Sequence, residues 1–216
     1  MKVVITGTSQ GIGLATAVLF LKAGHEVIGL DIKSSCIDHP KYVHHVCDVS
    51  VKSLMPRIDG VDVLVNNAGV QEEALNLAVN LVGTINATEM YGLQPSIKSI
   101  LNVTSVSAHN GAEFPLYTAS KGGVLSYTKW LAQEVAKYGA TANSVSPGGV
   151  VTPMTQDIVD DEEKLKAVYN ETLLGKWASA EEIAEWIYFM AVINKSATAQ
   201  DIIVDNGETA KYNFIQ

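Results

Sequence analysis

The sequence contains little cysteine, little charge and no long hydrophobic run. Cys36 and Cys47 are the two cysteines among 216 residues, so we expect reduced thiols in a cytosolic protein rather than a disulfide framework. No apolar stretch approaches the roughly 20 residues that a membrane span needs. The apolar run after Lys2 ends at Thr6, and no signal peptide is recognised. We therefore expect a cytoplasmic protein with no membrane partner.

Basic residues are outnumbered and scattered. The chain has 15 Lys and Arg against 23 Asp and Glu, a formal net charge of -8, and no basic run. Because neutralising a nucleic-acid backbone requires a basic patch, we expect no nucleic-acid partner. The hydrophobic content of 47% is slightly high for a globular protein, as buried parallel strands or subunit contacts would make it.

Short apolar runs alternate with segments of helical periodicity. This alternation is typical of an α/β fold, and we predict one domain over residues 1–216 with a doubly wound, Rossmann-like, mostly parallel sheet of seven strands and helices on both faces. Strands are expected at residues 2–6, 26–31, 42–47, 61–66, 97–104, 141–146 and 201–205. Helices are expected at residues 11–23, 72–91, 116–138, 157–170 and 180–192.

A glycine-rich segment lies between the first predicted strand and the first predicted helix. Its glycines are Gly7, Gly11 and Gly13. Such a turn lets the backbone approach a pyrophosphate closely, although it can also be purely structural. Asp31, at the end of the second strand, can accept hydrogen bonds from both adenine-ribose hydroxyls and would repel a 2′-phosphate. Gln10 is uncharged and Lys33 is the only nearby cation, so we expect NAD rather than NADP.

Tyr117 and Lys121 are four residues apart on a predicted helix, so their side chains share one face. An ammonium beside a phenol favours the phenolate, which otherwise forms near a pKa of about 10. Beside a bound nicotinamide, such a tyrosine can move a proton to or from an alcohol. The pair predicts a hydride-transfer enzyme, although alone it could be a surface pair.

These motifs, with others in the same order, resemble the short-chain dehydrogenase/reductase family almost from end to end. The segments that carry the resemblance are Thr6-Gly7-x-x-x-Gly11-Ile12-Gly13, Asp48-Val49, Asn66-Asn67-Ala68-Gly69, Ser105, Tyr117-x-x-x-Lys121, Pro147-Gly148 with Thr152, and Val204-Asp205-Asn206-Gly207. Asn206 stands where the family usually has glycine. The resemblance implies an NAD(H)-dependent oxidoreductase that interconverts a secondary alcohol and a ketone or aldehyde.

The resemblance also implies a role for each matching residue. The catalytic residues would be Tyr117 as acid/base, Lys121, Ser105 and Asn80. Cofactor binding would involve Tyr117, Lys121, Gly7, Ser9, Gln10, Gly11, Ile12, Gly13, Asp31, Asp48, Val49, Asn67, Ala68, Gly69, Pro147, Val150 and Thr152. Lys121 would hold the nicotinamide ribose and lower the pKa of Tyr117, and Ser105 would bind the substrate oxygen. Asn80 would hold a water that links Lys121 to solvent.

Several of these residues could also have purely structural roles. Ser105 is preferred for its position just after a strand, but Thr104 or Ser107 could share its place, and any of them could cap the loop. Asn80 could be a buried hydrogen-bonding residue of a helix. His109 could face either substrate or solvent.

No metal site is expected. His44 and His45 are adjacent on a predicted strand and therefore point to opposite faces, which is poor spacing for ligands even with His39 nearby.

Residues 153–175 are expected to form a lid over the substrate, as the resemblance implies. Their apolar side chains favour a small alcohol or ketone over a highly charged substrate. These side chains are Met154, Ile158, Leu165, Val168 and Leu173. The chain is short for the family before Val61 and before Asn80. The second gap trims a helix that the family often uses between subunits, and a homodimer or homotetramer is still expected.

Other functions stay open. A 3-oxoacyl thioester reductase usually takes NADPH, which Asp31 disfavours. A non-catalytic NAD-binding regulator is supported only by the shortened region before Asn80. An epimerase or lyase is possible because a fold does not set its reaction, although the chain shows no second substrate domain.

Overall fold

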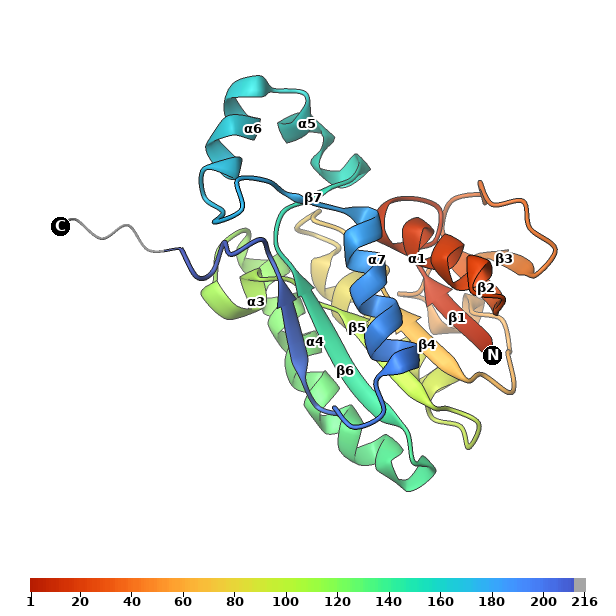
Figure 1. Cartoon of the computed structure of the whole chain (residues 1–216). Coiled ribbons are helices and arrows are strands. Elements are labelled where there is room, and N and C mark those ends of the chain that lie inside the picture. The colour runs from red at the N-terminus through yellow and green to blue at the C-terminus, as the bar shows by residue number, and fades with distance from the viewer. Residues whose placement is uncertain (212–216) are drawn as a thin grey trace.

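The computed structural model describes residues 1–211 and confirms the Rossmann-like sheet of seven parallel strands, in the order β3-β2-β1-β4-β5-β6-β9 (Figure 1). The strands are β1 (Lys2–Thr6), β2 (Glu26–Asp31), β3 (Tyr42–Val46), β4 (Val63–Asn66), β5 (Ser99–Val103), β6 (Thr141–Pro147) and β9 (Asp201–Val204). The strand order reverses between β1 and β4. Folds of this kind bind ligands outside the carboxyl ends of the strands at such a reversal.

Helices and short elements connect the strands. The α-helices are α1 (Gly11–Lys22), α2 (Gly83–Ala87), α3 (Ser107–Asn110), α4 (Pro115–Val135), α5 (Gln156–Val159), α6 (Glu162–Tyr169) and α7 (Ala180–Tyr188). The π-helical segments are η2 (Leu77–Val82), η3 (Thr88–Gly92) and η6 (Phe189–Ile193), and the 3-10 segments are η1 (Lys52–Leu54), η4 (Ala136–Tyr138) and η5 (Pro153–Thr155). None of the helices within residues 1–211 is long and apolar enough to cross a membrane.

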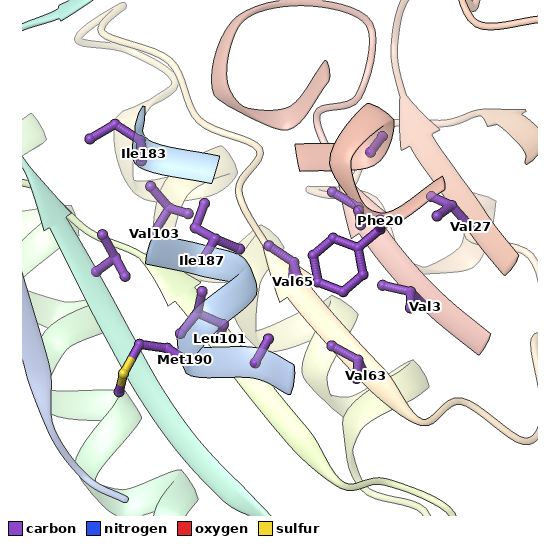
Figure 2. Close-up of a cluster of buried hydrophobic side chains, with 14 of the residues drawn as sticks. Val3, Phe20, Val27, Val63, Val65, Leu101, Val103, Ile183, Ile187 and Met190 are labelled. Atoms are coloured by element: carbon purple, nitrogen blue, oxygen red, sulfur yellow. The ribbon is translucent and has the colours of Figure 1, made fainter. Parts of the chain in front are cut away.

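Successive side chains of a strand point to opposite faces of the sheet, so a strand of consecutive apolar residues makes both faces apolar. Val3 and Ile5 join one core cluster, whereas Val4 between them joins the other. On the first face α1 and α7 pack against each other, and Figure 2 shows Ile187 of α7 near Val65 of the sheet. The second cluster contains residues of α4, which lies behind the sheet in Figure 1.

The helix predicted at residues 72–91 begins later, at Leu77, and residues 73–75 form a turn. Asn80 gives the physical reason. Its Oδ1 accepts a hydrogen bond from the Val70 N–H at 2.8 Å, and its Nδ2 donates to the Val70 carbonyl at 2.9 Å. Because the helix holds the backbone of Val70 in this way, the chain must turn back before the helix can start.

The helix predicted at residues 157–170 is broken into α5 and α6. Asp161 causes the break, since its side chain accepts hydrogen bonds from the backbone N–H groups of Glu163 and Lys164 and caps α6. A residue in this capping role has an extended backbone and cannot continue the preceding helix.

A small two-stranded sheet, absent from the sequence prediction, closes the segment that contains residues 153–175. It pairs β7 (Val150–Val151) with β8 (Ala178–Ser179) in parallel. Figure 1 shows α5 and α6 standing beyond β7, above the carboxyl ends of the central strands. The segment expected to form the lid therefore leaves the core after β7 and returns at β8, so that the pairing of these two short strands closes its base.

We expect Ile187→Ala to lower the free energy of unfolding by about 2–5 kcal/mol, because it leaves a cavity between α7 and the sheet. Ile187 is fully buried. Leu54→Ala is a control, since Leu54 is 61% exposed and its truncation should cost less than about 0.5 kcal/mol. Urea denaturation measures both, and equal losses would contradict the assignment of the core.

Candidate active site

A cavity of about 870 Å³ opens at the carboxyl ends of the central strands. Gly7 follows β1, Ala68 follows β4, Ser105 follows β5 and Pro147 ends β6, and all four line the cavity. This volume lies near the upper end of ordinary ligand pockets. Because parallel strands bring these ends to one edge, residues as far apart in the sequence as Gly7 and Pro147 share a single site.

The structure brings most of the site residues named from the sequence into this cavity. Those that line it are Gly7, Gln10, Gly11, Ile12, Asp31, Asp48, Val49, Asn67, Ala68, Gly69, Ser105, Tyr117, Lys121, Pro147, Val150 and Thr152. Ser9, Gly13 and Asn80 are not part of the lining and support it from behind.

The glycine turn is locked to the loop after β4. Thr6 Oγ1 accepts hydrogen bonds from the backbone N–H groups of Asn67 and Ala68, both at 3.0 Å. Asn67 Nδ2 donates to the carbonyl oxygens of Thr6 and Gly7. A Cβ on Gly13 would lie 2.0 Å from the Gly7 carbonyl oxygen, so only glycine allows α1 to begin so close to the turn. This close approach fits the cradle that a dinucleotide pyrophosphate needs.

Asp31 lies at the expected end of β2 and faces the cavity. Its Oδ2 accepts from the Ser9 N–H at 2.9 Å and its Oδ1 from the Lys33 N–H at 2.8 Å. Each carboxylate oxygen can accept a further hydrogen bond, so both remain suitable for ribose hydroxyls. The Lys33 ammonium donates to Gln10 Oε1 at 2.6 Å beside it.

Three residues that the sequence analysis did not assign support this end of the cavity. Tyr42 OH lies 2.9 Å from both Thr8 Oγ1 and His44 Nδ1, and His44 Nε2 lies 2.8 Å from the Lys33 carbonyl oxygen. Tyr42 and His44 are on β3, so this chain of hydrogen bonds ties the strand to the turn after β2. Only the pairing of β2 with β3 brings these residues together.

Tyr117 and Lys121 lie side by side at the start of α4, and both are buried. Lys121 Nζ is 5.7 Å from the centre of the Tyr117 ring and donates to the Val103 carbonyl oxygen at 3.0 Å. Burial lowers the pKa of Lys121 to about 8, against the opposing charge of Glu113. The helix begins at Pro115, a residue suited to the first turn because it has no N–H to satisfy.

The pKa of Tyr117 differs from the expectation drawn from the sequence. Burial, and to a lesser degree the negative charge of Glu113, raise it to about 12, against the opposing effect of the nearby Ser105 hydroxyl. The lowered pKa that the resemblance implied is therefore not found here, and Lys121 is not among the groups that act on this pKa. Desolvation of the phenol is the largest effect, and the Lys121 ammonium is directed at the Val103 carbonyl oxygen.

Ser105 is the hydroxyl best placed to act beside Tyr117. It lines the same cavity as Tyr117, and its side chain acts to lower the pKa of the phenol. Thr104 instead donates to the Val145 carbonyl and lies 2.6 Å from Ser146 Oγ. Ser107 does not line the cavity, and its N–H donates to Ser105 Oγ at 3.2 Å.

Asn80 is buried and uses its amide to hold the active-site helices together. Besides bonding to the Val70 backbone, its Nδ2 donates to Ser120 Oγ at 3.1 Å. Asn76, one turn earlier, was missed from the sequence. With its amide oriented by its partners, Asn76 donates to the Val70 carbonyl at 2.7 Å and accepts from the Tyr117 N–H at 3.3 Å. It thereby satisfies a free N–H in the first turn of α4.

The side chain of His109 is partly exposed and is hydrogen-bonded to residues of two neighbouring strands. Its Nε2 lies 2.9 Å from Asp201 Oδ2 and 3.1 Å from Ser146 Oγ, and it does not line the cavity. Asp201 also accepts from Ser144 and Ser146. This network attaches the segment after Ser105 to β6 and β9.

The expected lid supplies part of the cavity wall, but fewer of its apolar residues face the cavity than predicted. Met154 and Ile158 line the cavity, whereas Leu165, Val168 and Leu173 do not. The break before α6 carries Leu165 and Val168 away from the opening, and Leu173 packs on the Gly207 backbone, where a Cβ would be 2.7 Å from the Leu173 side chain.

Comparison with known proteins agrees with this geometry. Residues 7–209 match the family described as enoyl-(acyl carrier protein) reductase. The chain belongs to the short-chain dehydrogenase/reductase family. It is thus an oxidoreductase of a family that binds a nicotinamide cofactor.

The relatives of this chain within the family have names that describe different activities. The chain is 34% identical to the 3-oxoacyl-[acyl-carrier-protein] reductase FabG of Thermotoga maritima, over 94% of this chain and 95% of that one. It is 26% identical to the aldohexose dehydrogenase of Thermoplasma acidophilum, with a TM-score of 0.87 over 100% and 96% of the two chains. A gluconate 5-dehydrogenase from Burkholderia cenocepacia, solved with NADP and tartrate, is 25% identical, with a TM-score of 0.85 over 98% and 96%.

We expect Glu113→Gln to lower the pKa of Tyr117 below its value of about 12, because the substitution removes a negative charge that disfavours the phenolate. Tyrosinate absorbance after rapid pH jumps, with Tyr117→Phe subtracted, measures this titration. Glu73→Gln removes an exposed charge outside the cavity and should leave it unchanged. An unshifted titration in Glu113→Gln would show that burial alone sets the pKa.

Proposed function

We propose that this chain is an NAD(H)-dependent dehydrogenase/reductase that interconverts a secondary alcohol and a ketone or aldehyde. The observation that carries the proposal is that Tyr117, Ser105 and Lys121 share one cavity with a glycine turn suited to a dinucleotide. When bound, the nicotinamide supplies or accepts the hydride. The chain supplies the binding, the orientation and the proton transfer.

Each catalytic side chain has a separate task. Ser105 donates a hydrogen bond to the substrate oxygen and positions it near the Tyr117 hydroxyl. Tyr117 gives its proton to a carbonyl oxygen in reduction and takes the alcohol proton in oxidation. Lys121 binds the nicotinamide ribose. Because burial holds Tyr117 in its protonated form at neutral pH, the site is ready for reduction, whereas oxidation requires the phenolate.

Asp31 supports NAD over NADP. Its carboxylate can accept bonds from the ribose hydroxyls and would repel a 2′-phosphate. Lys33, bonded to Gln10, is the cation closest in sequence that could offset this repulsion. The gluconate 5-dehydrogenase structure contains NADP, so the fold is also compatible with that cofactor, and the proposal for NAD rests on the side chain at position 31.

Reduction of a 3-oxoacyl thioester is a second candidate, favoured by the similarity to the reductase of T. maritima. Its chemistry would use the same serine and tyrosine, and acetoacetyl-CoA is the substrate that tests it. A non-catalytic regulator is disfavoured because it would have no use for an assembled set of Ser105, Tyr117 and Lys121.

We also propose a homo-oligomer. Exposed apolar side chains gather on two helical surfaces that a second copy could cover. These are Leu77, Val82 and Trp130 on η2 and α4, and Trp186, Phe189 and Ile193 on α7 and η6. The cytoplasmic location expected from the sequence stays a prediction.

We expect Tyr117→Phe to reduce kcat for alcohol oxidation and carbonyl reduction by about 10²–10⁴-fold, because the proton donor and acceptor is lost. Binding of NADH, followed by fluorescence, should change little. Tyr138→Phe removes a half-buried hydroxyl outside the cavity and serves as the matched control. Undiminished turnover in Tyr117→Phe would refute the assigned role.

We expect Asp31→Asn to shift the ratio of NADPH to NADH affinity toward NADPH by about 10-fold or more, because a charged acceptor of ribose hydroxyls and a source of phosphate repulsion are both removed. Titration of each cofactor gives the two dissociation constants. Asp38→Asn, an exposed aspartate of the neighbouring loop, removes the same charge. A wild-type protein that prefers NADPH would overturn the NAD proposal.

A further inference from the structure

The loop before α4 carries a carboxylate that the reaction proposed above does not use. Glu113 lines the cavity, two residues before the first residue of α4, and is exposed. Its backbone φ is 79°, in the left-handed region that disfavours residues with a Cβ. Local backbone preference would favour glycine at this position, so the side chain needs another explanation.

Gln71 holds this carboxylate from another loop of the site. Its Nε2 donates to Glu113 Oε2 at 3.1 Å, and both residues line the cavity. Gln71 belongs to the loop after β4, whereas Glu113 follows α3, so the hydrogen bond joins two separate segments of the cavity lining. Within residues 1–211, Glu113 Oε1 has no hydrogen-bond partner. An ionised carboxylate only accepts hydrogen bonds, so this oxygen is suited to a donor on the substrate.

The charges at this end of the cavity disfavour an anionic substrate. Glu113 lines the cavity, and its charge acts on the phenol of Tyr117. Glu208 does not line the cavity but adds a second negative charge near Glu113. The Lys121 ammonium is bonded to the Val103 carbonyl. Glu113 would therefore repel a substrate carboxylate or phosphate, whereas a hydroxyl can donate to it.

We propose that Glu113 is a specificity-determining residue that accepts a hydrogen bond from a second hydroxyl beside the reacting carbon, so that the substrate is a neutral vicinal diol or polyol. The inference rests on the proposed function and names its substrate class. Although the side chain reaches water, the surrounding protein partly desolvates it and raises its pKa, aided by Glu208 and opposed by Gln71 and Lys121. A partly desolvated acceptor binds a hydroxyl more strongly than one in bulk water.

The test compares 1,2-cyclohexanediol with cyclohexanol, which lacks only the second hydroxyl. We expect kcat/KM of the wild type with NAD to favour the diol by about 10-fold or more, and Glu113→Leu to remove that preference. The ratio is informative because a change in the pKa of Tyr117 affects both alcohols alike. Glu113→Gln keeps an acceptor oxygen and should retain part of the preference.

Two further variants separate specificity from folding. Glu113→Gly removes the carboxylate but suits a φ of 79°, so it should stay folded and lose the preference as Glu113→Leu does. Glu73→Leu removes an exposed carboxylate outside the cavity and should keep the preference of the wild type.

Calorimetric binding of the two alcohols to NAD-saturated Tyr117→Phe gives a readout without turnover. Tighter binding of the diol that is lost in Tyr117→Phe/Glu113→Leu supports the inference even if no alcohol is oxidised, a result that would count against the proposed function alone. Turnover of both alcohols with equal kcat/KM, equal binding of both, or a preference that survives Glu113→Leu would overturn the inference. A Glu113-dependent preference for 2-aminocyclohexanol over the diol would also overturn it, since the donor would then be a cation.

Discussion

The site depends on the hydrogen bonds that join the ends of β1 and β4. Thr6 Oγ1 receives two backbone N–H groups of the loop after β4, and the Asn67 amide donates back to the glycine turn. These bonds join the two loops at the point where the strand order reverses. Because Gly13 has no side chain, α1 can begin next to the glycine turn. Because hydrogen bonds between side chains and backbone groups fix both loops, the cavity is shaped before any ligand enters, which lowers the entropy lost on binding.

Burial governs the electrostatics at the other end of the cavity. Tyr117 and Lys121 both shift toward their neutral forms, since desolvation disfavours either charge. Glu113 adds to this effect on the tyrosine and opposes it on the lysine. The protonation of Tyr117 and Lys121 is therefore governed by their surroundings rather than by the contact between them, and the charge of Glu113 contributes to the electrostatics of the site.

Buried polar side chains hold this arrangement from behind. Asn76 and Asn80 are buried and connect the shortened region after β4 to α4. A satisfied buried network of this kind favours one geometry, because any alternative would leave polar groups unpaired. The trimmed segment before Asn80 therefore still places the helix against Tyr117, and its shortness does not separate the two.

The strands, the glycine turn and the Tyr117–Lys121 pair could be predicted from the sequence because each is a pattern of neighbouring residues. Hydrophobic runs, glycine at a strand–helix turn and a spacing of one helical turn need no distant partner to be recognised. The tertiary structure alone decided the partners of Asn76 and His109, the pKa of Tyr117, which lid residues face the cavity, and the place of Glu113 opposite Gln71. Each of these depends on groups brought together from separate strands and loops, and their distances and desolvation exist only once the sheet has formed.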